Sequence, residues 1–428
     1  MTGAVVSRRA VLGAAVGAAA TGMTGCVSPR RPIQVAVVWS ADELARFRDV
    51  LSGYHDHPVD VVSVRNDMDG FLRARYGTGN QPDVAIFPQI GLIADYARRR
   101  WLAKLEFLNN RYPDAWNAPL RVDGPLYGAW VKATHKSLFW YAPGALPDGR
   151  EPASWAEFAD LVKRLAGAGP GSGRRAPLAI GAADGWVLTD WFENVLASVT
   201  TDLEYRSITN GESPWDGDKV RIALGRLADV WGIPNAFPHG GRRALLTQNE
   251  ESVTQVFARN EAAMVFEGDF VAAVAAGFGA SPPLPKFRFP PVEGDQRLLV
   301  AGDAAVVFKG SQTGTGLVNW LTGPEQPFSR WMKAGGYLPP QRRDQQQDGG
   351  DPLIGEFSGQ LREATTRGLL RFDLSDQLRG SLGGPDGLGI WKILQDFFAD
   401  VAVRRLAAED AVDRACRGLE AARRAAAA

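Results

Sequence analysis

Residues 33–51 read IQVAVVWSADELARFRDVL, an apolar run followed by a helical pattern, and this stretch decides the fold class. The run at 33–38 is typical of a buried strand, and apolar residues then recur at the spacing of one helix face. Between the two, Ser40 and Glu43 fit a capping box at the start of the helix. The stretch therefore predicts one strand–helix unit of an α/β protein.

The same alternation continues along the next fifty residues. Apolar strands at 59–64 and 84–87 alternate with short helical segments. Such a series predicts a parallel sheet with right-handed crossovers. Ligands of these sheets bind outside the carboxyl ends of the strands, which here are residues 39–40 and 87–89. Beyond them the pattern predicts helices over 155–165, 189–199, 218–230 and 252–259, and strands over 177–180, 262–266 and 300–308.

The composition argues against several classes of function. The chain has 428 residues, long enough for two or three domains, and a formal net charge of zero from 48 Lys+Arg and 48 Asp+Glu. Nucleic-acid binding needs a concentrated basic excess, which is missing. Two cysteines and four scattered histidines offer neither a disulfide framework nor a set of metal ligands. We therefore expect no cofactor, no metal and no nucleic-acid partner.

The first 26 residues have the pattern of a targeting segment. A twin-arginine motif at 7–12 precedes a small, weakly apolar run at 13–21. Met23-Thr24-Gly25-Cys26 follows and resembles the lipobox of bacterial lipoproteins. We expect residues 1–26 to be a signal peptide, Cys26 to carry the lipid, and residues 27–32 to be a linker. The sequence thus predicts a protein anchored by lipid to the extracellular face of a bacterial cell membrane.

Five segments, in chain order, resemble one known family. They are PDVAIFPQ at 82–89, GPLYGAWVKATHKSLFWY at 124–141, GWVLTDWFEN at 185–194, NEAAMVFEGDF at 260–270 followed by AGD at 301–303, and RFDLSDQ at 371–377 followed by GIW at 389–391. Together they resemble the extracellular solute-binding proteins (family 1) of carbohydrate ABC transporters. Within that family the alpha-glucoside-binding lipoproteins are the most similar subgroup.

The resemblance implies a periplasmic-binding-protein-like α/β fold, with two lobes joined by crossing hinge strands and a ligand cleft between them. Lobe 1 is expected over 33–128 plus 298–336, and lobe 2 over 129–297 plus 337–428. It implies a monomeric receptor, not an enzyme, that captures a carbohydrate and delivers it to the permease subunits of an ABC importer. The expected ligand is an alpha-glucoside di- or oligosaccharide.

The candidate site residues lie at predicted strand ends or in the matched segments. Aromatic rings stack on the C–H faces of a sugar, and carboxylates and amides bind its hydroxyls. The stacking candidates are Trp39, Trp130, Trp186 and Phe270. The polar candidates are Gln89, Lys132, Asp190, Asp269, Asp303 and Asp376, with Ser40 and Gly302 completing the set.

Other interpretations remain open at this point. Each Trp is also a common core residue, Asp190 also suits the start of a helix, and Asp376 also suits an N-cap. A receptor for a sugar phosphate, a glycerophosphodiester or an oligopeptide would need cations in the cleft, for which Lys132 and Arg371 are the candidates. A secreted glycan-acting enzyme, or an interaction protein that has lost its ligand, are the alternatives from other classes.

Overall fold

The computed structural model describes residues 31–64, 67–167, 175–280, 283–324, 327–342, 351–378, 382 and 389–427. The predicted signal peptide with Cys26, and the predicted linker up to residue 30, lie outside the described residues. Residues 32–428 form one compact unit. Among the described helices, none has both the length and the apolar character needed to cross a bilayer.

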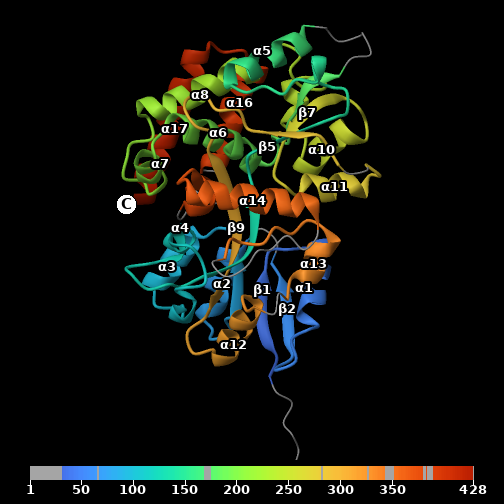
Figure 1. Ribbon diagram of the computed structural model, residues 1–428. Coiled ribbons are helices and arrows are strands. Elements are labelled where there is room, and N and C mark those ends of the chain that lie inside the picture. Colours follow the sequence, from blue (N-terminus) through green and yellow to red (C-terminus); the bar gives the residue numbers. More distant parts are fainter. Residues whose placement is uncertain are drawn as a thin grey trace, which may run out of the picture. The chain divides into compact units, whose positions relative to one another are not determined.

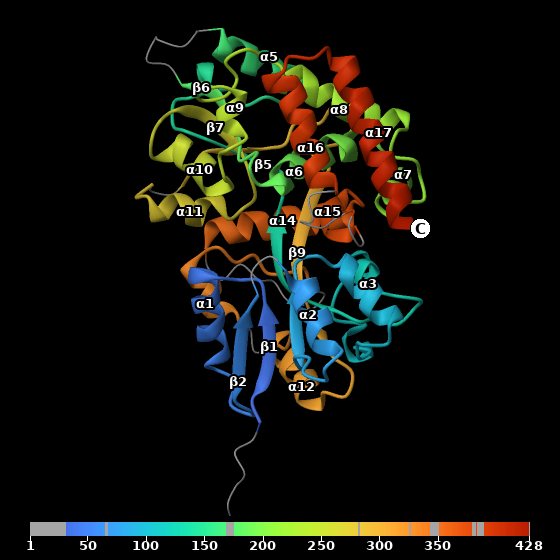
Figure 2. The ribbon, with the colours of Figure 1, turned by 180° about the vertical axis from the view of Figure 1, so that it is seen from behind.

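The predicted α/β fold class is confirmed, because two β-sheets are covered by helices (Figures 1 and 2). The strands are β1 Ile33–Val37, β2 Val59–Ser63, β3 Val84–Phe87, β4 Ala129–His135, β5 Leu138–Tyr141, β6 Ala176–Ala179, β7 Ala262–Phe266, β8 Lys286–Arg288, β9 Leu298–Val307 and β10 Leu370–Phe372. The α-helices are α1 Ala41–Leu51, α2 Met68–Tyr76, α3 Gly91–Arg98, α4 Asp114–Asn117, α5 Trp155–Ala166, α6 Gly185–Val199, α7 Asp202–Thr209, α8 Asp218–Trp231, α9 Gly241–Ala244, α10 Asn249–Phe257, α11 Val271–Gly277, α12 Gln312–Leu321, α13 Ser329–Ala334, α14 Pro352–Thr366, α15 Leu374–Gln377, α16 Ile390–Phe398 and α17 Ala408–Ala427. Short turns of other helix types are η1 Glu106–Leu108, η2 Ala118–Leu120, η3 Pro147–Gly149 and the π-helical η5 Ala399–Val403.

The first sheet has the strand order β10-β9-β3-β1-β2, with β4 paired to β9. β1 lies parallel to both β2 and β3, which confirms the parallel arrangement predicted for the three N-terminal strands. β9 runs antiparallel to β3 and β4. The second sheet has the order β6-β7-β5-β8, with β5 antiparallel to both of its neighbours.

β4 and β9 run side by side and connect the regions of the two sheets. All ten residues of β9 are buried, and in Figures 1 and 2 this strand rises from beside β1 toward α6 and α16. Gly302 permits the close pairing, because a Cβ there would lie 2.7 Å from the carbonyl oxygen of Lys132. The predicted boundaries put β4 and β10 in lobe 2, whereas both pair with β9 in the first sheet. The lobe limits themselves stay a prediction.

The described residues form two hydrophobic cores. One fills the first sheet and its helices and reaches one face of the second sheet, where it includes Trp140 and Val265. The other core lies on the opposite face and includes Phe139 and Met264. Neighbouring residues of a strand thus enter different cores, as the alternation of side chains requires.

Candidate functional site

A cavity of about 390 Å³, here called the central cavity, is lined by residues of β4 and β9, by loop residues that follow β1, β3, β4 and β7, and by residues of the surrounding helices. This volume lies within the range of about 300–1,000 Å³ that is typical of small-molecule sites. Residues that follow β1 and β3 line it, as expected from the rule for strand carboxyl ends. The lining residues are Val38, Trp39, Glu43, Met68, Pro88, Gln89, Leu92, Lys132, Thr134, Lys136, Trp186, Phe270, Ala301, Gly302, Asp303, Ser375, Asp376 and Trp391.

Eight of the twelve candidate residues line the central cavity. They are Trp39, Gln89, Lys132, Trp186, Phe270, Gly302, Asp303 and Asp376. The other four are not among its lining residues: Ser40, Trp130, Asp190 and Asp269. Whether the eight contact a ligand stays a prediction.

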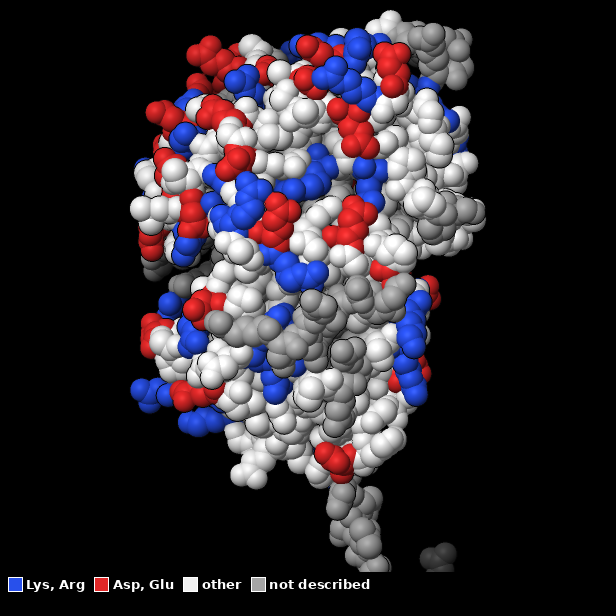
Figure 3. Space-filling model, in the orientation of Figure 1, with Lys and Arg blue, Asp and Glu red and all other residues white. Residues whose placement is uncertain are grey.

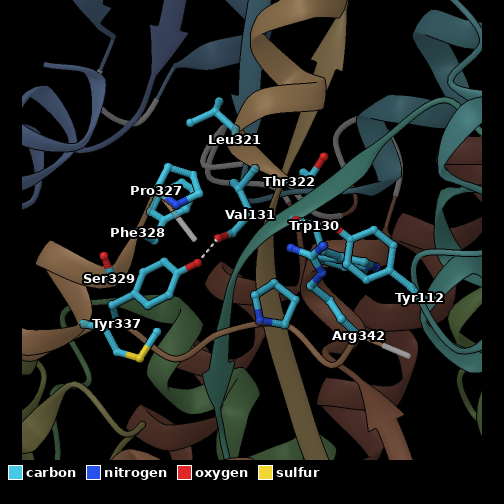
Figure 4. A pocket seen from close by; sticks show the side chains of 12 residues that line it. Tyr112, Trp130, Val131, Leu321, Thr322, Pro327, Phe328, Ser329, Tyr337 and Arg342 are labelled. Carbon is cyan, nitrogen blue, oxygen red and sulfur yellow. Dashed lines mark hydrogen bonds between the residues drawn. The ribbon is translucent and has the colours of Figure 1, made fainter. Parts of the chain in front are cut away.

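Trp130, predicted as a stacking platform, is packed in the core and does not line the central cavity. Its side chain is 1% exposed, and its indole Nε1 donates to the backbone oxygen of Trp116 at 2.6 Å. Figure 4 shows Trp130 beside Tyr112 in a different and much smaller cavity, of about 20 Å³. A register shift between Trp130 and Lys132 separates two residues that strand alternation would place on one face.

Asp190 and Asp269 do not line the central cavity and bind other parts of the protein. Asp190 is 2% exposed and pairs with Lys136, whose Nζ lies 2.8 Å from Oδ2. Asp269 Oδ1 accepts a hydrogen bond from the backbone N of His135 at 3.2 Å. Burial raises the pKa of Asp269 to about 7. Both carboxyls therefore bind the segment 134–136, in which Thr134 and Lys136 line the cavity.

Ser40 is exposed and stands directly before α1, but the predicted capping box is wrong. Its side chain makes no capping hydrogen bond. Glu43 instead accepts from Lys132, with Nζ 2.6 Å from Oε1. The carboxylate that the pattern assigned to the backbone thus binds a cavity residue on β4.

The aromatic rings of the cavity come from α6, from α16, from the loop after β1 and from the residue before α11. Trp186 and Phe270 meet edge to face, with ring centroids 6.2 Å apart. Trp39 is 4% exposed, and its Nε1 donates to Oδ2 of Asp303 at 3.2 Å. Trp391 was not a candidate. It packs closely against Gly185 at the start of α6, where a Cβ on residue 185 would lie only 2.4 Å from the Cβ of Trp391.

Both lysines of the cavity are paired with carboxylates of the protein. Lys132 binds Glu43 and lies 5.4 Å from the centre of the Trp331 ring. Lys136 binds Asp190 and Asp373 and lies 4.7 Å from the Trp186 ring. Burial lowers the pKa of Lys136. The neighbouring carboxylates raise it by more than burial lowers it, so the pKa of Lys136 stands well above its ordinary value.

Two carboxyl groups face the cavity without a lysine bound to them. Burial raises the pKa of Asp303 to about 6, against the opposing effect of Lys132. Burial and the neighbouring Asp373 raise the pKa of Asp376 well above its ordinary value. A protonated carboxyl donates a hydrogen bond and an ionised one accepts, so both groups suit hydroxyls.

Asp190, Glu193 and Asp373 hold oxygen atoms within 4.8 Å of one another, a spacing that suits a metal ion. Nζ of Lys136 lies 2.8 Å from Asp190 and 3.3 Å from Asp373. The chain's own ammonium therefore supplies positive charge to this cluster. Its arrangement is that of an internal ion pair that supports the cavity.

Sequence reasoning missed several lining residues, and the signal for some of them was present. Lys136 and Trp391 both stand in segments that carry the family resemblance. Glu43 was assigned to a cap. Met68 begins α2 after residues 65–66, which lie outside the described part, and no local pattern marked it.

Comparisons with known proteins agree with this arrangement. Residues 47–326 match the family of bacterial extracellular solute-binding proteins. The chain is 27% identical over 386 residues to the osmoprotective compounds-binding protein GgtB of Synechocystis sp., covering 84% of this chain and 89% of that protein. It is 28% identical over 363 residues to the alpha-glucosides-binding periplasmic protein AglE of Rhizobium meliloti, covering 76% and 74%.

The fold recurs in solved structures. The bacterial solute receptor AcbH aligns with a TM-score of 0.73 at 15% identity, over 90% of this chain and 97% of that one. This likeness shows a common fold, with two sheets connected by crossing strands. Because the family match covers most of the chain and the fold agrees, the chain belongs to the bacterial extracellular solute-binding proteins.

Proposed function

We propose that the protein is a receptor that binds an alpha-glucoside di- or oligosaccharide in the central cavity and delivers it to an ABC importer. One observation carries the proposal. Aromatic rings and polar side chains from the crossing strands β4 and β9, from strand ends and from helices line a single cavity of about 390 Å³. Rings bury the apolar faces of a sugar, and the polar groups take its hydroxyls.

The charges of the cavity favour a neutral ligand over an anionic one. Lys132 and Lys136 are each bound to carboxylates of the protein, so a phosphate would have to displace these carboxylates from the lysines. Arg371, the other cation considered for an anionic ligand, is not among the residues that line the central cavity. Asp303 and Asp376 add acidic groups to the wall.

Isothermal titration against a panel of sugars tests the proposal. Maltose, trehalose and sucrose contain an alpha-linked glucose, and cellobiose and lactose serve as beta-linked controls. We expect heat and a raised melting temperature with at least one alpha-glucoside. Binding of the beta-linked sugars alone would remove the alpha-glucoside assignment, and no response to any saccharide would remove the receptor function.

Turnover separates a receptor from a glycan-acting enzyme. The protein is incubated with maltose, trehalose or sucrose, and released glucose is measured. A receptor releases less than one glucose per protein molecule. Continued release above that ratio would assign an enzyme instead.

The lipid anchor is a separate part of the proposal. It rests on the twin-arginine motif and on Cys26 within the sequence Met-Thr-Gly-Cys. Expression in a bacterial host should place the protein in the membrane fraction, with acyl chains on Cys26 by mass spectrometry. Cys26→Ala should move it to the soluble fraction, and an unchanged distribution would contradict the anchor.

A further inference from the structure

Another cavity, of about 310 Å³, lies between α7, β10, α15 and the α4–η2 turn, and is here called the α7 cavity. It shares no described lining residue with the central cavity. The short helix α15 contributes to both, since Ser375 and Asp376 line the central cavity and Gln377 lines the α7 cavity. In Figure 1, α7 and α4 lie one above the other at the edge of the molecule.

Two guanidinium groups in the α7 cavity share one carboxylate. Asp202 accepts from Arg371, with Nη1 3.2 Å from Oδ1, and its other oxygen binds Arg206. The side chain of Arg371 is 4% exposed, and its Nε has no hydrogen-bond partner among the described residues. Its Nη1 also donates to the backbone oxygens of Gly368 and Leu370. Because two guanidinium groups share the single carboxylate of Asp202, the cavity has an excess of positive charge.

The surroundings add to that excess. Burial, and then the nearby Arg297, lower the pKa of Arg371 to about 10. Figure 3 shows Lys and Arg side chains gathered at the level of α7 and α14, with a few Asp and Glu between them. Tyr205 is already engaged, because its hydroxyl donates to the backbone oxygen of Phe372 at 3.0 Å. The arginines are therefore the groups that an anion would meet.

We propose that the α7 cavity is a second binding site, which holds a phosphate group between Arg371 and Arg206. Arginine's planar fork bonds two phosphate oxygens at once, and such charge-assisted bonds are strong. Asp202 is the competing anion, since it occupies both arginines when no ligand is bound. The competition gives two variants with opposite expected effects.

Inorganic phosphate is the probe, titrated by calorimetry at constant ionic strength against chloride. Arg206→Gln removes one cation from an exposed position and should weaken phosphate binding at least about fivefold. Asp202→Asn removes the competing carboxylate and should tighten it at least about threefold. The matched control is Arg330→Gln, whose exposed pair with Asp49 lies outside the cavity and which should leave phosphate binding unchanged.

Trp186→Ala distinguishes the α7 cavity from the central cavity, because Trp186 lines only the central cavity. This variant should bind phosphate as the wild-type protein does, whatever its affinity for sugars. Saturable phosphate binding that moves in opposite directions in the Arg206 and Asp202 variants supports the proposal. Equal affinity in both variants, an equal response to chloride, or no saturable binding would overturn it. None of these outcomes bears on the alpha-glucoside proposal, which the saccharide panel tests separately.

Discussion

Nζ of Lys136 lies 2.8 Å from Oδ2 of Asp190, and the same ammonium lies 3.3 Å from Asp373. Lys136 stands between β4 and β5, Asp190 on α6, and Asp373 directly after β10. One buried cation therefore joins the crossing strand to a helix of the second sheet and to an edge strand of the first. It also lies over the ring of Trp186, which lines the central cavity.

Replacing Lys136 with Met should destabilise the protein strongly. The change leaves Asp190 and Asp373 buried without their cation, and breaking such a pair costs about 3–5 kcal/mol. Urea unfolding followed by circular dichroism measures the loss. Lys392→Met is the matched control, because its pair with Asp396 is about half exposed, and its loss should be at most about 1 kcal/mol. Similar losses in the two variants would contradict the role given to Lys136.

Sugar affinity should depend on pH through Asp303. Folding raises the pKa of this carboxyl to about 6, so its ionisation makes the folded protein less stable as the pH rises from about 4 through 6. A sugar hydroxyl that donates to the carboxylate favours the ionised form. Binding should therefore weaken about tenfold between pH 7 and pH 5 in calorimetric titrations.

The control for this pH effect is Asp303→Asn, which removes the titrating group and keeps the shape of the side chain. Its affinity should be lower at pH 7 and nearly flat over the same interval. If Asp303→Asn shows the same dependence of sugar affinity on pH as the wild-type protein, the dependence comes from another group, such as Asp376.

Trp186 and Trp130 should respond differently to the same truncation. Trp186→Ala removes a ring from the wall of the central cavity and should weaken sugar binding about tenfold or more, with a small change in stability. Trp130→Ala opens a hole in the core and should cost about 3–5 kcal/mol of unfolding free energy. Chemical unfolding and calorimetry on both variants separate the two effects. A large loss of stability in Trp186→Ala would make it a core residue as well.

The parts of the fold that local patterns decide could be predicted from the sequence. β1, β2 and β3 are short apolar runs, and their parallel pairing follows from the helices between them. The antiparallel insertion of β9 into the same sheet could not be predicted, because its partner β3 lies more than two hundred residues earlier in the chain. The start of α6 was placed four residues late, at 189. Gly185 begins this helix and leaves room for the distant Trp391.

The candidate site was predictable where a strand end or a matched segment marked it. Trp39 and Gln89 follow β1 and β3 and line the central cavity. The core position of Trp130 depends on packing that one strand does not reveal, since a register shift lies beside it and its indole donates to the backbone oxygen of Trp116. Glu43 was missed because a residue pattern describes neighbours in sequence, whereas its partner Lys132 is far away in the chain.

Ser40 and Thr201 each stand directly before a helix but differ in capping, and this difference gives a further prediction. Thr201 Oγ1 accepts from the backbone N of Glu204 at 3.2 Å, and Glu204 accepts from the backbone N of Thr201 at 2.7 Å, which is a complete capping box at α7. Thr201→Ala should therefore cost about 1 kcal/mol of unfolding free energy. Ser40→Ala should change stability by less than about 0.5 kcal/mol, because the Ser40 side chain makes no capping hydrogen bond. Urea unfolding of both variants decides the matter, and an equal cost at Ser40 would show that its hydroxyl does cap α1.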